Sequence, residues 1–423
     1  MLWSLAACDQ DDPDRPIVSV GMMDATMSEA GSSEAGVVDD CKSDDASCHR
    51  TEGASDCDHD GFSPDEGDCD DCNIARGPGA YDLPQNGVDE DCTGGDAQET
   101  LAACDARLDA VGADHGEAAK AVGLCAREVN RASRRWGLID SRWLRLSGDE
   151  TLLDTRQVWF PEHFGAAKAR EGSRLLVMST GVARDVDAEG YTDQCDVLGS
   201  TLDMTGAWTG GVAPPKGFPR DSSLCDTRDV SKGARAYNDV GLELTLRAPT
   251  NATGLAFESI FYTYEYPDFV CTRYNDFFVV LMDPAPHDFQ QDDNVLFDDN
   301  GQPIGVNTGF LSVCRSTSRA SENRSKNYPC PGGVSLLAKT GFDAKEASCA
   351  PLPKGATDLG GASTGWLRTE LPVVAGSVFK LRFVLWDSGD PLLDSTVALD
   401  HLRFVFADPD APTVVGTKPI AFD

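Results

Sequence analysis

Basic residues are scarce in this sequence. The 423-residue chain has 36 Lys and Arg against 70 Asp and Glu, which gives a formal net charge of −34 at pH 7. The imbalance is steepest in residues 1–100, where 26 acidic residues stand against 4 basic ones. A chain of this kind repels nucleic acid and anionic membranes and attracts cations. We therefore expect no nucleic-acid partner.

Histidine and recognisable catalytic motifs are rare as well. The 6 histidines form no His-Glu-x-x-His motif, so nothing indicates a histidine-bound zinc. The stretch GASTG places Ser363 in a Gly-x-Ser-x-Gly pattern, but no apolar strand precedes it and no helical pattern follows it. We therefore expect no enzymatic activity. The alternative is a polysaccharide hydrolase of the glycoside hydrolase type, which needs two carboxylates about 5–9.5 Å apart in a cleft.

Long hydrophobic runs are missing. The longest, FFVVLM at 277–282, has the length of a strand and falls well short of the ~18 apolar residues of a membrane span. At the start of the chain, Leu5-Ala6-Ala7-Cys8 closes a short apolar run and resembles the bacterial lipobox, whose cysteine is acylated. The resemblance implies an exported protein, lipidated at Cys8. We expect it to be held at the bacterial envelope, on the outer membrane or cell surface, through the lipid anchor only.

Cysteine, in contrast, is abundant. The chain has 15 cysteines, which points to an oxidising compartment. Without Cys8 the number is even and allows seven disulfides. Apolar residues fall near helical spacing between residues 97 and 135, where a bridge between Cys104 and Cys125 would staple two short helices.

Changes of composition and periodicity divide the chain. Strict alternation at Leu242, Leu244 and Leu246, and again at Leu381 and Phe383, predicts half-buried strands. Long Gly- and Pro-rich loops between such strands favour a mainly β fold, a jelly-roll-type β-sandwich, with a small calcium-binding, disulfide-stapled N-terminal module and short helices between. The predicted segments are a lipobox-like signal remnant (1–8), a disordered acidic tether (9–55), an Asp-rich metal-binding module (56–95), a helical connector (96–135), the sandwich (136–410) and a tail (411–423).

The Asp-rich module predicts a cation site. Alternate residues are acidic at Asp56, Asp58 and Asp60, the following glycine permits a sharp turn, and Phe62 can offer its carbonyl oxygen. Hard oxygen ligands of this kind suit structural Ca²⁺. We expect a second set to meet around the same module, and its members are Asp68, Asp70, Asp71, Asp89 and Asp91. The alternative is a solvated acidic linker without ordered ions.

The stretch from 56 to 94 also resembles a metal-binding motif of secreted bacterial proteins. The matching elements are Gly67 to Asp71, the Pro-Gly-Ala of 78–80 and Asn86 to Cys92. The resemblance implies a disulfide between Cys69 and Cys92. The name of that motif is linked to copper, but no cluster of His or Met supports copper here, so calcium is our first expectation and copper the alternative.

The larger part of the chain resembles the choice-of-anchor L domain of bacterial surface proteins. The matching elements are the Ser-Thr-Gly of 179–181, Glu265-Tyr266-Pro267, Asn275 to Phe278, VNTGFLSVC at 306–314 and the later WDSGDPLLDS. The family implies a secreted or surface-anchored β domain and no particular reaction.

The acids of these elements allow two interpretations. They form a second metal site if the fold brings together Glu265, Asn275, Asp276, Asp387, Asp390 and Asp394. Otherwise they satisfy backbone groups at turns and strand ends.

The combined expectation is a surface-anchored, calcium-binding lipoprotein with a non-catalytic binding or adhesion domain. Its partner would be a cell-surface protein or a glycan. Beside the hydrolase alternative stands a purely structural component of the envelope.

Overall fold

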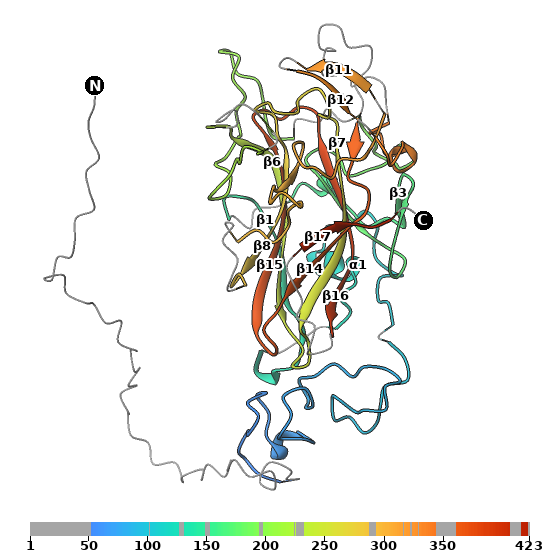
Figure 1. Cartoon of the computed structure of the whole chain (residues 1–423), viewed down its shortest axis with the longest axis vertical. Helices are drawn as coiled ribbons and strands as arrows, with labels where there is room; N and C mark the ends of the chain where they lie inside the picture. Colours follow the sequence, from blue (N-terminus) through green and yellow to red (C-terminus); the bar gives the residue numbers. More distant parts are fainter. Residues whose placement is uncertain are drawn as a thin grey trace, which may run out of the picture. The chain divides into compact units, whose positions relative to one another are not determined.

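The structure is a computed structural model that describes residues 52–100, 102–126, 131–148, 153–193, 198–223, 225, 232–286, 293–315, 317–321, 324–328, 330–343, 361–406 and 416–421. Cys8 and nearly all of the predicted tether lie outside the described residues. Mainly β structure is seen, in antiparallel sheets (Figure 1).

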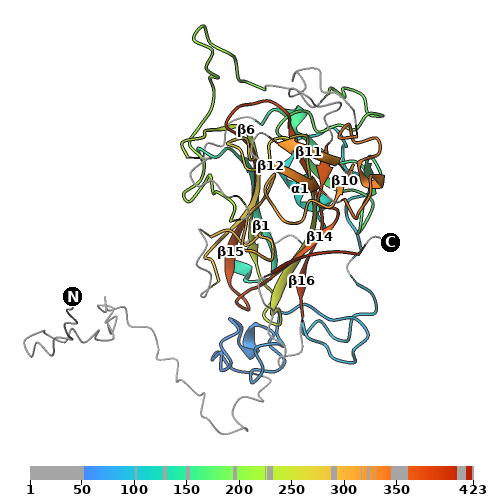
Figure 2. The ribbon, with the colours of Figure 1, turned by 45° about the horizontal axis from the view of Figure 1, so that its top comes forward.

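Two sheets pack face to face in the large domain, which is a β-sandwich (Figure 2). The first sheet has the order β1 (Gly137–Leu144), β6 (Ala236–Arg247), β15 (Val378–Ser388), β8 (Phe277–Asp283) and β9 (Ile304–Gly305). The second has the order β10 (Val313–Cys314), β13 (Ala362–Ser363), β7 (Gly254–Thr263), β16 (Ser395–Val405), β5 (Leu176–Ser179) and β2 (Val158–Trp159); β14 (Leu367–Pro372) also pairs with β7, and β17 (Gly416–Pro419) pairs with β14.

The core lies between these sheets and follows the predicted alternation. Leu242, Leu244 and Leu246 of β6 are fully buried in it, and Phe383 of β15 meets Phe257 of β7 edge to face, with ring centroids 5.3 Å apart. Because side chains alternate across a strand, the residues between these positions face away from the shared core. The predicted β-sandwich is confirmed.

Smaller elements complete the described structure. Two hairpins pair β3 (His163–Phe164) with β4 (Ala167–Lys168) and β11 (Thr317–Ser321) with β12 (Arg324–Tyr328). The helical segments are α1 (His115–Ala121) and the 3-10 turns η1 (Pro64–Glu66), η2 (Arg131–Ser133), η3 (Thr155–Gln157) and η4 (Ser335–Leu337).

Two predicted segments differ from what the structure shows. The connector has one α-helix, α1, whereas most of its other described residues form turns and irregular chain. Its apolar residues Leu108, Ala118 and Val122 nevertheless pack into the main core, which explains the helical-looking spacing. The predicted tail contains β17, which extends the second sheet beyond residue 410.

Disulfides hold the module and the long loops. The bridges Cys69–Cys92 and Cys104–Cys125 form as predicted. Two further bridges lie in the sandwich: Cys225–Cys271 links two loops, and Cys314–Cys330 links β10 to a loop. Each bridge restricts the unfolded chain, which stabilises segments that have little core of their own.

The module contacts the sandwich at the turn between β6 and β7. The backbone N–H of Tyr81 donates to Asn251 Oδ1 (3.0 Å), and Asn251 Nδ2 donates to the carbonyl of Tyr81 (2.7 Å). The N–H of Thr250 donates to the carbonyl of Gly79 (3.0 Å). A Cβ atom at Gly79 would lie 2.9 Å from both Phe62 and Thr250, so glycine is needed for this close approach.

We expect Asn251→Ala to weaken this contact by about 1–2 kcal/mol, because it leaves both backbone groups of Tyr81 without their side-chain partner. The measurement is amide hydrogen exchange at Tyr81, which should become faster, together with urea unfolding. Unchanged exchange at Tyr81 would contradict the role given to Asn251.

Candidate metal centre

The first acidic group lies in the loop before η1. Oxygen atoms of Asp56, Asp58 and Asp60 come within 4.8 Å of one another. Backbone donors set these side chains: the N–H of Asp60 donates to Asp58 Oδ1 (2.9 Å), and the N–H of Phe62 donates to Asp60 Oδ1 (2.7 Å). Gly61 N–H donates to Asp56 Oδ2 (3.0 Å). The backbone therefore holds one oxygen of each carboxylate by a hydrogen bond, and the second oxygen has no hydrogen-bond partner.

The second group shares Asp58 with the first. It joins Asp58 to Asp68 and Asp71, again within 4.8 Å. Asp68 Oδ1 accepts from the N–H of Asp70 (2.8 Å), and Asp71 Oδ1 accepts from the N–H of Cys57 (2.8 Å). Because Asp58 belongs to both groups, we treat the five aspartates 56, 58, 60, 68 and 71 as one unit, which we call the acidic centre.

The free oxygens of the acidic centre are buried and unsatisfied. None of the following atoms has a hydrogen-bond partner: Asp56 Oδ1, Asp58 Oδ2, Asp60 Oδ2, Asp68 Oδ2 and Asp71 Oδ2. Two of these side chains, Asp68 and Asp71, are only 4% and 1% exposed. A buried polar atom without a partner is costly, and a buried charge more so. Each of its two groups of three carboxylates could hold a metal ion, which would give the unpartnered oxygens of that group a partner.

The pKa values of the acidic centre reflect the burial and close spacing of its carboxylates. Burial, followed by repulsion from Asp58 and other acids, raises the pKa of Asp60 to about 7 despite the hydrogen bond from the backbone of Phe62. The same causes raise the pKa of Asp68 to about 6. A bound cation would reverse this effect, because opposite charge favours the ionised form.

A third group lies nearby and was only partly predicted. Asp89 and Asp91 come within 4.8 Å of Asp82, and not of the set that contains Asp68 and Asp71. The Thr93 N–H donates to both Asp89 (3.0 Å) and Asp91 (3.1 Å). Asp82 has no sequence signal of its own, because its place in the group depends on how the loop folds back.

Arg76 lies between the two halves of the predicted second set. Its Nη1 atom makes an ion pair with Asp70 Oδ2 (3.1 Å), and its Nη2 atom donates to the carbonyl of Asp89 (3.5 Å). The guanidinium thus connects the two halves of the predicted set.

The ring of Phe62 is buried beneath the guanidinium of Arg134, whose Cζ atom lies 4.7 Å from the centroid of the ring. Ligation by the Phe62 carbonyl stays a prediction.

The predicted acids of the sandwich are placed together at strand ends. Glu265 follows β7, Asp276 precedes β8, Asp387 lies in β15 and Asp394 precedes β16; all four are at most 2% exposed. Asp390 lies in the loop between β15 and β16, where burial raises its pKa and Arg273 partly opposes that rise. Asn275 is turned elsewhere, since its Oδ1 accepts from the N–H of Asn307 (3.1 Å).

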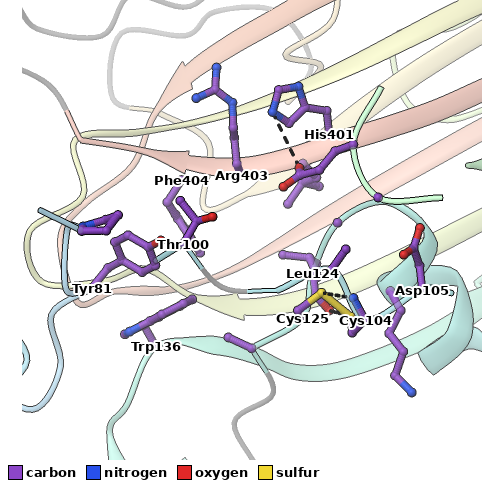
Figure 3. A pocket seen from close by; sticks show the side chains of 18 of the residues that line it. Tyr81, Thr100, Cys104, Asp105, Leu124, Cys125, Trp136, His401, Arg403 and Phe404 are labelled. Atoms are coloured by element: carbon purple, nitrogen blue, oxygen red, sulfur yellow. Dashed lines mark hydrogen bonds and ion pairs between the residues drawn. A yellow bond between two sulfur atoms is a disulfide. The ribbon is translucent and has the colours of Figure 1, made fainter. Parts of the chain in front are cut away.

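A pocket of about 390 Å³ lies where the module, the connector and the sandwich meet (Figure 3). Aromatic rings form one end: Tyr81 stacks on Phe406 (4.8 Å) and meets Trp136 edge to face (5.3 Å). The disulfide Cys104–Cys125 lies toward the other end. Sequence reasoning missed this pocket, because its walls come from six separate stretches of the chain.

Charged groups surround the same pocket. His401 Nε2 lies 3.6 Å from Glu171 Oε2, and Arg403, Glu171 and Lys120 are exposed at the lining. Both signs are present, so the rim favours neither anions nor cations. The dimensions fall in the range of small-molecule sites, about 300–1,000 Å³.

No protein family, curated protein or solved structure matches the chain. The resemblances to the metal-binding motif and to the choice-of-anchor L domain therefore stay predictions. In the part of the chain that the structure describes, no helix combines the length and the apolar character needed to cross a membrane. Ser363 lies buried in β13, where its Oγ accepts from the N–H of Gly365 (3.2 Å).

Proposed function

We propose that this chain is a calcium-binding protein of the bacterial cell surface, with a non-catalytic binding domain. The observation that carries the proposal is the set of five buried, unpartnered carboxylate oxygens in the acidic centre. Such a set is unfavourable by itself and becomes favourable around a cation. The module has little apolar core, so ions and disulfides take the place of one.

Calcium fits the acidic centre better than copper does. All of the converging atoms are carboxylate oxygens, and the three acidic groups contain neither histidine nor cysteine. Hard oxygen donors in a loop suit Ca²⁺, whereas copper selects imidazole, thiolate or thioether. The role that follows is structural: the ion holds together the loops on either side of Cys69–Cys92.

The pocket supports binding as the role of the larger domain. Aromatic faces beside a rim of mixed charge suit a neutral ligand that has both apolar and hydroxyl-bearing faces, such as a sugar ring of a surface glycan. Anchoring through a lipid on Cys8 would place this pocket outside the cell. A hydrolase would need two accessible acids in one cleft, and the acids Glu265, Asp276 and Asp387 of the sandwich are buried.

Calcium titration of the chelator-stripped chain carrying Cys8→Ser tests the proposal. We expect saturable heat release and a higher melting temperature. Asp58→Asn should weaken binding at least ~10-fold, because Asp58 belongs to two of the acidic groups. Glu99→Gln, an exposed change in the connector just after the module, is the matched control and should leave the titration unaltered. Absence of heat at millimolar Ca²⁺, with heat on titration of Cu²⁺, would replace calcium by copper; absence of both would leave an acidic linker.

A further inference from the structure

The strand pairing brings four acids of the sandwich to one place. Ser395 of β16 pairs with Thr263 of β7, so Asp394 and Glu265 lie at the same end of the second sheet. Trp386 of β15 pairs with Phe277 of β8, which brings Asp387 beside Asp276 at one end of the first sheet. The two ends are joined, because Ser395 Oγ donates to Asp276 Oδ2 (2.7 Å). We call the four residues Glu265, Asp276, Asp387 and Asp394 the buried corner.

The hydrogen bonds of the buried corner favour ionised carboxylates. Both oxygens of Asp276 accept, Oδ2 from Ser395 and Oδ1 from the N–H of Ser388 (2.9 Å). Asp387 Oδ2 accepts from Asn238 Nδ2 (2.9 Å). Donors that point at a carboxylate stabilise its charged form. Hydrogen-bond donors of the chain therefore face the carboxylates of both Asp276 and Asp387.

Nothing in the described chain neutralises those charges. Among the described residues, no Lys or Arg makes an ion pair with Glu265, Asp276 or Asp387, and the side chains are 2%, 0% and 0% exposed. A buried carboxylate without an opposite charge beside it is unfavourable.

Two oxygen atoms of the buried corner remain without partners. Glu265 Oε2 and Asp387 Oδ1 are buried and accept no hydrogen bond. Glu265 follows β7 of the second sheet, whereas Asp387 lies in β15 of the first sheet. The space beside the corner is also tight, since a Cβ atom at Gly181 would lie 1.9 Å from Asp394 Oδ2. A small cation could serve as a partner for such oxygens in a space that has no room for a larger group.

We propose that the buried corner is a second divalent-cation site, suited to Ca²⁺, with Glu265, Asp276, Asp387 and Asp394 as its ligands. The site goes beyond the proposed function, which rests on the acidic centre of the module. The ion is coordinated by residues at the ends of β7, β8, β15 and β16 and so cross-links the two sheets. The adjacent turn has glycine at position 181, where a larger residue would displace the carboxylate of Asp394.

The bound calcium per chain tests this site. The full chain with Cys8→Ser is stripped with chelator and dialysed against Ca²⁺, and the metal is counted by elemental analysis. Glu265→Gln is the first variant, because Oε2 has no hydrogen bond to lose. We expect it to bind one ion fewer than the parent chain. Glu189→Gln, an exposed acid in a turn, should bind the full number.

A second variant keeps this test separate from that of the module. Asp58→Asn should lose ions of the acidic centre and keep the ion of the buried corner, whereas Asp387→Asn should do the reverse. If Glu265→Gln and Asp387→Asn both retain the full number of ions and melt at a higher temperature than the parent in chelator, the acids are neutralised by protons and the site does not exist. Loss of one ion in each, with the ions of the module retained, supports it.

Discussion

Glu258→Gln is expected to lower the free energy of unfolding by about 2–4 kcal/mol. Glu258 lies in β7 on the face opposite the shared core and is 1% exposed. Its carboxylate accepts from Arg170 Nε (2.8 Å) and Arg368 Nη2 (2.7 Å), and His401 Nδ1 lies 3.4 Å away. The amide of glutamine cannot accept from all three groups. The arginines are half-exposed and can turn to water, which keeps the loss below that of a fully buried pair.

The same carboxylate predicts part of the acid sensitivity. Burial alone would raise the pKa of Glu258, but the hydrogen bonds from His401, Arg170 and Arg368 outweigh it and hold the pKa at about 2. A folded-state pKa below the unfolded value of about 4.3 gives stability that is complete above that value. The contribution is lost as the pH falls from about 4 to about 2.

Urea unfolding at pH 7, 4 and 2.5 checks both parts. The parent chain should lose more stability between pH 4 and 2.5 than Glu258→Gln does, because the variant has no carboxylate to protonate there. Glu370→Gln, a half-buried acid on neighbouring β14, is the control and should follow the parent. Parallel curves for the parent and Glu258→Gln would show that the carboxylate does not provide the expected stability.

A matching arrangement exists on the first sheet. Glu243 of β6 makes ion pairs with Arg142 of β1 (2.7 Å) and Arg382 of β15 (2.6 Å), and the strand register places all three in one row. Each sheet thus carries a glutamate beneath two arginines, from adjacent strands in the first sheet, and from β14 and the loop after β4 in the second. These rows let the outer faces of the sheets bury polar side chains without leaving charge unpaired.

The sequence predicted those parts of the fold that depend on short-range patterns. Alternation at Leu242, Leu244 and Leu246 identified a core strand, because side chains on a strand repeat every two residues. The spacing of Asp56, Asp58 and Asp60 also predicted a local group, because the three residues lie within one short loop. The two predicted disulfides also form.

Long-range packing decided what could not be predicted. Asp71 joins Asp58 because the N–H of Cys57 holds its other oxygen, and no local pattern states that contact. The connector has a shorter helix than its spacing predicts, because its apolar residues reach the core partly from turns. The pocket depends on Tyr81, Trp136 and Phe404 meeting from distant segments. Such contacts follow from the fold and not from the neighbouring residues.

Gly77→Ala is expected to weaken calcium binding at the acidic centre at least ~10-fold while leaving the calcium-free fold nearly unchanged. A Cβ atom at this position would lie 2.2 Å from Asp60 Oδ2 and 3.3 Å from its Cγ. The backbone at Gly77 does not have the positive φ that only glycine favours, so alanine adds no backbone strain. Its N–H bond to the carbonyl of Glu90 (2.8 Å) is also kept. The added methyl group therefore disturbs the Asp60 carboxylate and little else.

Asp60 can rotate away from the new methyl group, but it then loses its bond from the N–H of Phe62 and withdraws one ligand from the acidic centre. Calorimetric titration measures the weaker affinity, and thermal unfolding at a fixed Ca²⁺ concentration should show about 1.4 kcal/mol less stabilisation for each tenfold loss. Gly416→Ala on β17 is the matched control, since its Cβ meets open space. Equal calcium affinities for Gly77→Ala and Gly416→Ala would mean that the ion does not need Asp60, so that Asp58, Asp68 and Asp71 hold it without that carboxylate.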